Sequence, residues 1–303
     1  MMSGAVVLSA IFLAVAWPIA RALRSPRDES LLRWAERRGI TLDAETRPLV
    51  HVYLSRSRRI RAAGTALGIG LALLIRGCHS HHSGLAGNPA VLGVGGFLLA
   101  SLVAEMVMPK LIGPRRSAVL VPRAASDYVP AMLLWALPLF AVGLGALALR
   151  VAFVRPPVTR WITCHNIRQT FTYAQEPAVS SIALAAVCLV AVLLAGLVLR
   201  ATVRRPQRAT SPAGIAVDDA IREASANAAV GAALGLLFLA TSDFTSELAA
   251  RASVPCGTSP MRLLSWMTLG ALGAAVASWA WFSRRSRGVH RKVYGPTVSV
   301  HGA

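Results

Sequence analysis

The residues best suited to bind a ligand lie in a short segment, residues 78–82, with the sequence CHSHH. Thiolate and imidazole are side chains that zinc and copper ions prefer, and a second short run, CHN, begins at Cys164. The two runs could converge on one Zn(II) or Cu ion. The predicted donors are Cys78, His79, His81 and His82. The simpler interpretation is a polar turn with structural cysteines, because spacing within so short a segment is not diagnostic.

Ionisable residues are rare inside the apolar stretches, and Glu105 is the clearest of them. It lies between LVA and MVM, four residues before Pro109. A carboxylate in such surroundings must be protonated, paired with a cation or exposed to water. Glu105 is therefore a candidate functional residue within the membrane.

Glu223 and Asn227 are two further polar candidates within the membrane. They are four residues apart, and the same spacing leads on to Gly231 and Gly235. One face of this predicted helix therefore carries polar side chains at its start and glycines further along. The GxxxG spacing recurs in residues 64–68 and is typical of closely packed helices, so we expect packing here rather than a permeation path.

Common catalytic motifs are absent from the sequence. It has no P-loop, HExxH, GxSxG or kinase signature, and no cofactor is predicted. Gly93, Gly95 and Gly96 fall in an apolar stretch with no strand before them, so they do not predict a nucleotide loop. An enzyme is the least supported class, although scattered residues could serve a lipid-modifying membrane enzyme.

The composition predicts apolar helices, and these helices must position the candidate residues. Of the whole chain, 55% of the residues are hydrophobic and 15% are charged, and the mean hydropathy is +0.55. Too little polar surface remains to cover a soluble protein of 303 residues, whereas a bilayer requires none. Seven apolar stretches predict an all-α bundle of seven transmembrane helices in a single membrane domain. They lie near residues 3–20, 62–75, 88–108, 129–149, 178–199, 225–241 and 263–282.

Charge predicts the orientation of this bundle. Alternate connections carry 25 of the 32 Lys and Arg residues on one side and 7 on the other. Basic connections stay in the cytoplasm, which places the N-terminus outside and the C-terminus inside. Stretch 62–75 is short for a span, but omitting it reduces the bias to 18 against 14. Arginines follow stretch 3–20 rather than precede it, which favours an uncleaved anchor over a signal peptide; cleavage would leave six helices with the same sidedness.

The isoelectric point near 11.6 also results from the Lys and Arg residues of the cytoplasmic connections. Basic cytoplasmic connections account for most of the net charge, so nucleic acid is not an expected partner. Only Lys110 and Lys292 are lysines, a bias typical of a GC-rich bacterial genome, and we expect a multi-pass protein of the bacterial cytoplasmic membrane.

Residues 21–61 are expected to form a basic, helical cytoplasmic loop. Acids at 28–29, bases at 37–38 and Gly39 predict a short helix whose apolar face rests on lipid headgroups. Asp43 is expected to cap a second helix that continues into stretch 62–75. The arginines of this second helix would bind anionic lipid or dock a partner; a solvated basic face is the simpler interpretation.

Acids also precede two later stretches, at Asp127 and at residues 218–219. Unpaired amides at a helix start favour a nearby carboxylate, so we interpret these acids as helix caps rather than as a substrate or partner site. Pro138 lies well inside stretch 129–149 and is expected to bend that helix.

Three of the four cysteines, Cys78, Cys164 and Cys256, fall on the predicted outer, oxidising side, while Cys188 lies in an apolar stretch. Cys164 and Cys256 stand in the middle of connections long enough to meet, whereas Cys78 is held in a short loop beside histidines. We therefore predict a Cys164–Cys256 disulfide.

Three segments carry a family resemblance: residues 46–64 (TRPLVHVYLSRSRRIRAAG), 126–130 (SDYVP) and 217–222 (VDDAIR). Across about residues 40–240 the chain resembles a group of uncharacterised integral membrane proteins of actinomycetes. The resemblance implies a polytopic membrane fold in such bacteria, and it carries no known activity.

Two functional interpretations remain open besides the enzyme. The first is a membrane subunit or accessory protein that acts on a membrane-protein partner through basic cytoplasmic loops. The second is a permease for a small molecule or ion, which would usually show helices broken near mid-membrane. Most prolines here stand near the ends of the predicted helices, which favours the first interpretation.

Overall fold

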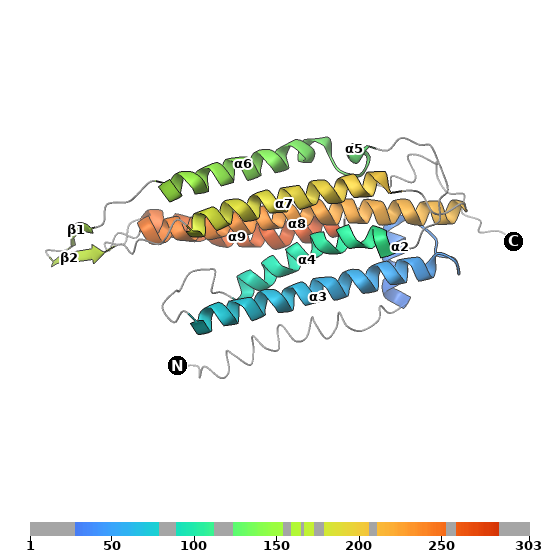
Figure 1. Ribbon diagram of the computed structural model, residues 1–303, viewed down its shortest axis with the longest axis horizontal. Coiled ribbons are helices and arrows are strands. Elements are labelled where there is room, and N and C mark those ends of the chain that lie inside the picture. The colour runs from blue at the N-terminus through green and yellow to red at the C-terminus, as the bar shows by residue number, and fades with distance from the viewer. Residues whose placement is uncertain are drawn as a thin grey trace.

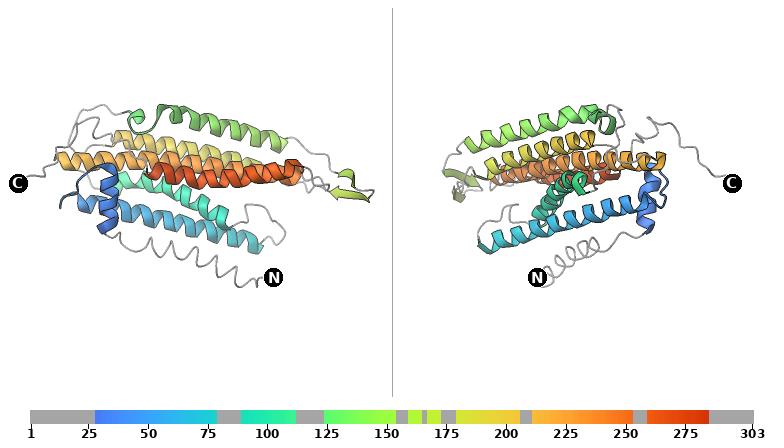
Figure 2. Two further views of the ribbon diagram at one scale, coloured as in Figure 1. Left: turned by 180° about the vertical axis from the view of Figure 1, so that it is seen from behind. Right: turned by 45° about the vertical axis from the view of Figure 1, so that its right-hand side comes forward.

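The computed structural model describes residues 28–78, 89–111, 124–153, 159–164, 167–172, 179–205, 211–252 and 259–284. Its long helices form an elongated bundle and alternate in direction along the chain (Figures 1 and 2). The helices are α2 (Asp28–Arg38), α3 (Arg47–Cys78), α4 (Pro89–Leu111), α5 (Ala125–Tyr128), α6 (Ala131–Phe153), α7 (Val179–Arg204), α8 (Pro212–Ala252) and α9 (Ser259–Arg284). The predicted helical bundle is confirmed, and six of the seven apolar stretches coincide with helices; stretch 3–20 lies outside the described residues.

One hairpin departs from the predicted all-helical fold. Strands β1 (Thr159–Cys164) and β2 (Ile167–Thr172) pair antiparallel, with Cys164 opposite Ile167. Their sequences, TRWITC and IRQTFT, are rich in β-branched and aromatic residues, which favour strands over helix.

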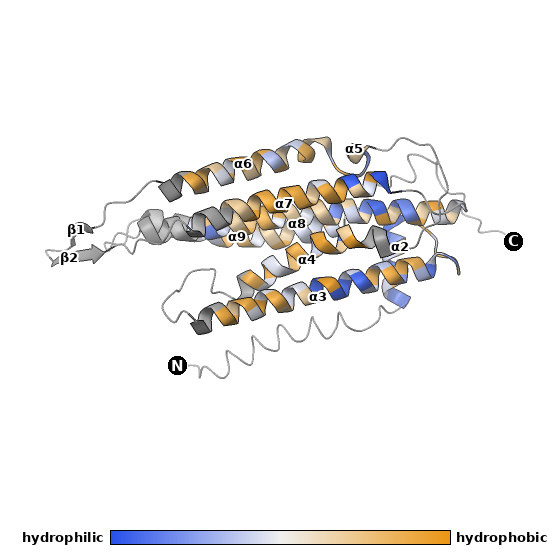
Figure 3. Cartoon of the chain, in the orientation of Figure 1, coloured by the Kyte–Doolittle hydropathy of each residue, from blue (hydrophilic) through white to orange (hydrophobic). Residues whose placement is uncertain are grey.

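Several helices have the character of membrane spans. Within the described ranges, three are long and apolar enough to cross a bilayer, in the windows Ala131–Leu149, Ala185–Arg204 and Ala213–Thr245. Large apolar side chains are exposed along α3, α6, α7 and α9; Leu67 and Trp135 are 74% and 75% exposed. Figure 3 shows how hydrophobic residues predominate along α6 and α7. Exposed apolar surface of this extent is a liability in water and is required in lipid. The chain is therefore a membrane protein.

The long helix α8 is the centre of the bundle. Its apolar window is 83% buried, against 22% and 28% for the windows of α6 and α7. Apolar side chains from α4, α6, α7 and α9 surround it, and the largest core cluster includes Leu98, Leu144, Val198, Leu237 and Phe282.

Glycines allow close approach between two helix pairs, as the GxxxG spacings predict. A methyl group on Gly64 would overlap the carbonyl oxygen of Gly96, and one on Gly68 would overlap that of Leu92, so the α3 and α4 backbones are in contact. A methyl group on Gly231 would lie 2.8 Å from Phe282 Cβ in α9. Gly93, Gly95 and Gly96 lie within α4, which confirms that they form no nucleotide loop.

The start of α3 forms as the sequence predicts. Helix α2 ends before Gly39, whose φ of 63° favours glycine. Asp43 Oδ1 accepts hydrogen bonds of 2.7 Å from both the amide and the hydroxyl of Thr46. The Thr46 hydroxyl accepts a bond from the Asp43 amide in return, and α3 then continues through stretch 62–75.

The prediction for the apolar face of α2 is wrong. Leu31 and Ala35 pack in a second core with Val50 and Tyr53 of α3 and Ile221 of α8, not on lipid headgroups. We call this second unit the helical cap: α2, residues 47–60 of α3 and residues 212–224 of α8. Helix α2 crosses the bundle direction there (Figure 1). The first turns of α8 cover the apolar face of α2, because α8 begins at Pro212, well before the predicted residue 225.

The two predicted acidic caps have different outcomes. Asp127 Oδ2 accepts a 2.7 Å hydrogen bond from the amide of Ala124, so Asp127 does act as a cap, but of the separate short helix α5 and not of α6, the helix of stretch 129–149. The prediction for Asp218 and Asp219 is wrong, because α8 starts at Pro212 and both acids lie inside the helix. Ser211 caps α8 instead; its Oγ accepts a hydrogen bond from the amide of Gly214 at 3.2 Å.

Candidate functional site

Buried polar side chains gather at one end of the bundle, where the helical cap meets the ends of α4 and α7. Burying charge is costly unless each group is paired, so a buried charged cluster is the first place to look for a functional site. The cluster contains the buried residues Arg38, Tyr53, Glu105, Arg205, Asp218, Asp219, Arg222, Glu223 and Asn227.

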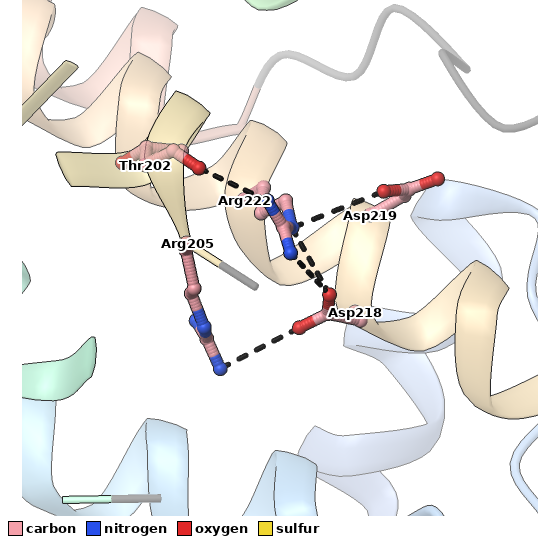
Figure 4. Close-up of polar contacts among 5 residues, drawn as sticks. All are labelled: Thr202, Arg205, Asp218, Asp219 and Arg222. Carbon is pink, nitrogen blue, oxygen red and sulfur yellow. Dashed lines mark hydrogen bonds and ion pairs between the residues drawn. The ribbon is translucent and has the colours of Figure 1, made fainter. Parts of the chain in front are cut away.

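The first group within this end is centred on Arg222 of α8, which is fully buried (Figure 4). Its Nε and Nη2 atoms donate to Asp218 Oδ2 at 3.0 and 2.8 Å. The two residues are four apart, so successive turns of one helix bring them together. Two bonds from one guanidinium to a carboxylate are shorter and stronger than neutral hydrogen bonds.

This pair also joins α8 to the end of α7. Arg205, directly after α7, lies 3.5 Å from Asp218 Oδ1, and Arg222 Nη1 donates to the Thr202 carbonyl oxygen at 3.1 Å (Figure 4). Asp219 Oδ1 is 4.0 Å from Arg222 Nε. Two arginines and two aspartates therefore balance in charge, which offsets the cost of removing each from water.

The second group joins α3 to α4 around Glu105, whose side chain has no exposed surface. Arg61 Nη2 donates to Glu105 Oε1 at 2.9 Å, and Tyr53 Oη donates to the same oxygen at 3.2 Å. The Arg61 guanidinium also lies 5.7 Å from the ring centre of Trp279 in α9. Of the three states expected for this acid, which were protonated, paired with a cation or exposed to water, the structure shows the paired one.

Tyr53 links Glu105 to the helical cap. Burial, followed by the nearby Glu105 carboxylate, raises the pKa of Tyr53 above its ordinary value, so the phenol stays protonated and donates. A hydrogen bond with the Ser225 side chain opposes that rise. The Tyr53 ring also lies 6.4 Å from that of Trp34 in α2.

Arg38 extends the polar cluster to the end of α2. Its guanidinium lies 4.3 Å from the Trp34 ring centre. Burial lowers the pKa of Arg38, and the nearby Glu223 carboxylate opposes that shift. An arginine remains charged under this influence, so it supplies a fixed positive charge near Glu223.

The predicted polar candidates are thus brought to one end of the bundle. Glu105, Glu223 and Asn227 are 1%, 3% and 1% exposed, and all three face the protein interior. Tyr53, Arg61, Arg205 and Arg222 were not among the predicted candidates. The i,i+4 spacing of Asp218 and Arg222 could have identified that pair, whereas the pairing of Arg61 with Glu105 depends on the tertiary packing of α3 on α4.

The predicted metal and disulfide residues lie at the limit of the described chain. His79, His81, His82 and Cys256 fall outside it, and the side chains of Cys78 and Cys164 are not described. In the part that is described, no three His, Cys, Asp or Glu residues come together as a metal site would require. Cys188, which lies in the apolar stretch 178–199, is a buried free thiol in α7.

Chemically, both groups are ion-paired networks: Glu105 accepts from Arg61, Asp218 accepts from Arg222, and Tyr53 donates to Glu105. Such an arrangement holds helix ends together. Comparisons with known protein families, curated protein sequences and solved structures give no match. The proposal below therefore depends on this geometry and on the charge pattern.

Proposed function

We propose that this chain is a seven-span protein of the bacterial cytoplasmic membrane that serves as an accessory subunit and binds a membrane-protein partner through its helical cap. The N-terminus lies outside and the C-terminus in the cytoplasm, which places the helical cap and the buried polar groups on the cytoplasmic side. The bias of 25 to 7 basic residues supports this orientation.

The length of α8 is the observation that carries the proposal. Its 41 residues span about 62 Å, roughly twice the 30 Å hydrocarbon thickness of a bilayer. Gly231 packs on Phe282, near the end of α9, so the first turns of α8 reach beyond the end of that helix. That half of α8 builds a cap with its own apolar core, which a helix serving only as an anchor would not need.

The surface of the cap suits a partner. Leu32 of α2 and Leu49 of α3 are exposed on the cap, and Arg33 and Arg37 are exposed on the same helix as Leu32. Apolar side chains bordered by charge are typical of protein interfaces.

Site-specific photo-crosslinking in living cells tests the proposal. A photoreactive residue at Leu32 or Leu49 should give one discrete crosslinked protein, identified by mass spectrometry after purification in mild detergent. The same residue at Trp135, on the lipid-exposed face of α6, is the control. If Leu32 and Leu49 give no discrete product, or only that of Trp135, the cap is no docking surface.

Cysteine labelling tests the orientation separately. In a cysteine-free background, single cysteines at Ser80 and Thr258 should react with an impermeant maleimide on intact cells. Single cysteines at Ser117 and Ser286 should react only after lysis. Labelling of Ser117 from outside would overturn the seven-span arrangement.

A permease is the second candidate, and the position of α8 supports it. The most buried helix carries Glu223 and Asn227, so a path along the bundle axis would pass them. Reconstituted vesicles loaded with a pH-sensitive dye should then show proton or solute-coupled flux that the Asn227→Leu variant reduces. Flux equal to that of protein-free vesicles would rule this candidate out.

A further inference from the structure

The exposed face of α3 changes from apolar to basic along one continuous stripe. Ala63, Leu67, Leu71 and Leu74 are exposed and lie three or four residues apart, which places them on one side of the helix. Gly70 lies on this side too, and a methyl group there would meet nothing within 4 Å. The opposite side of α3 packs on α4 through Gly64 and Gly68.

Two arginines extend this stripe toward the helical cap. Arg59 is exposed and lies four residues before Ala63, and Arg56 lies three residues before Arg59. The Nη1 atom of Arg56 is buried and has no hydrogen-bond partner in the described part of the chain. Helix α3 contains no Asp or Glu, so neither arginine has an acid on its own helix.

The dimensions of this stripe match one leaflet of a bilayer. From Arg59 to Leu71 is twelve residues, or about 18 Å along the helix, against roughly 15 Å for the acyl region of one leaflet. The leucines then lie beside an acyl chain, and the guanidinium groups lie at the depth of the phosphate. Arginine suits this position because its planar donors bind phosphate oxygens in pairs.

We propose that Arg56 and Arg59 form a binding site for the headgroup of an anionic phospholipid, with one acyl chain along Ala63, Leu67 and Leu71. Charge complementarity and the continuity of the two arginines with the exposed leucines select this occupant. Leu49 lies seven residues before Arg56 and on the same face of α3, so the headgroup site adjoins the surface proposed for the partner. The two proposals are tested separately, because lipid binding is measured on the purified protein and the partner is captured by crosslinking in cells.

Lipid binding to the purified protein in mild detergent tests the site. Native mass spectrometry would follow titration with phosphatidylglycerol and, separately, with phosphatidylcholine. Each arginine near a phosphate contributes about a fivefold gain in affinity, so the double variant Arg56→Gln, Arg59→Gln should bind phosphatidylglycerol about 25-fold more weakly. Phosphatidylcholine binding should change little. The double variant with Lys at both positions keeps the charges and should retain most of the affinity.

The matched control is Arg33→Gln, which removes one exposed arginine that is already paired with Glu29 on α2 at 3.3 Å. Its affinity for phosphatidylglycerol should stay within twofold of the unmodified protein. Equal binding of the two lipids by the unmodified protein, or an equal loss in Arg33→Gln, would overturn the proposal. A disulfide between two copies that both carry Leu67→Cys would also overturn it, since a second copy would then cover the stripe.

Discussion

Arg222 of α8 donates from Nη1 to the Thr202 carbonyl oxygen in the last turn of α7, at 3.1 Å. The last four carbonyl groups of a helix have no partner within it, and the helix dipole places partial negative charge there. Arg222 supplies both the missing donor and a positive charge. The end of α7 is therefore capped by a residue eighteen positions beyond that helix.

The first prediction follows from this contact. Arg222→Leu should lower the free energy of unfolding by about 3–5 kcal/mol, because it removes both hydrogen bonds to Oδ2 of the buried Asp218 and leaves that carboxylate only the longer contact with Arg205. Arg222→Lys should lower the free energy of unfolding by less, because lysine keeps the positive charge although it lacks the forked donors of the guanidinium. Thermal unfolding in detergent measures both. The double variant Asp218→Asn, Arg222→Leu should be less destabilised than the sum of the single changes; strict additivity would mean that the pair is not coupled.

The glycine contact between α3 and α4 gives a second prediction. Gly64→Ala should destabilise the protein by about 1–3 kcal/mol or more, because the new methyl group overlaps the α4 backbone. The control is Gly70→Ala on the same helix, where nothing lies within 4 Å. That change should be neutral or stabilising by up to about 1 kcal/mol, through helix propensity. Equal effects at the two sites would contradict the close approach.

The hydrogen bonds between Asp43 and Thr46 at the start of α3 make the free energy of unfolding depend on pH. Hydrogen bonds from the Thr46 hydroxyl and amide lower the pKa of Asp43 below its ordinary value. A lowered folded-state pKa means that the contribution is present above the unfolded pKa and is lost as the pH falls through the folded value. Asp43→Asn keeps a capping oxygen, so it should unfold at nearly the same temperature at pH 7 and lose less on acidification. An unchanged acid profile would contradict this.

Pro138 lies inside α6, and its effect on the helix axis stays a prediction. Because proline removes one amide donor and crowds the carbonyl four residues back, α6 should bend there. Spin labels placed at both ends of α6 should move apart when Pro138 is replaced by Ala. No change in the measured distance would show a straight helix.

The Cys164–Cys256 disulfide also stays a prediction. Such a bond would close a loop of 93 residues, worth up to roughly 4–5 kcal/mol by chain entropy and less in a chain already restrained by a membrane. Peptide mapping without reductant should recover the two cysteines linked. Linkage of Cys78 to either one would contradict both this pairing and the predicted role of Cys78 in metal binding.

Local patterns predicted much of the fold, and tertiary packing determined the rest. Asp43, Gly39 and the glycine spacings act through neighbouring residues, so they could be interpreted from the sequence. The start of α8 was missed because its first turns carry Asp218, Asp219, Arg222 and Glu223, which reduce the hydropathy of a helix whose charges pair internally.

The candidate site shows the same division. Glu105 stood out because a lone acid in an apolar stretch needs a partner, but the sequence could not show which cation supplies it. Arg61 is forty-four residues away, and only the contact of α3 with α4 brings the two together. The hairpin of β1 and β2 was overlooked because the apolar stretches dominated the pattern.

The contact of Gly64 with Gly96 has a consequence for how the chain enters the bilayer. Within the described residues, neither α3 nor α4 is by itself long and apolar enough to qualify as a span. One carries Arg61 and the other Glu105, and each charge alone opposes partitioning into lipid. Joined backbone to backbone, with those charges paired at 2.9 Å, the two helices present a far less polar unit. In the seven-span arrangement proposed above, biosynthetic insertion is thus expected to occur pairwise, with α3 held at the translocon until α4 emerges from the ribosome.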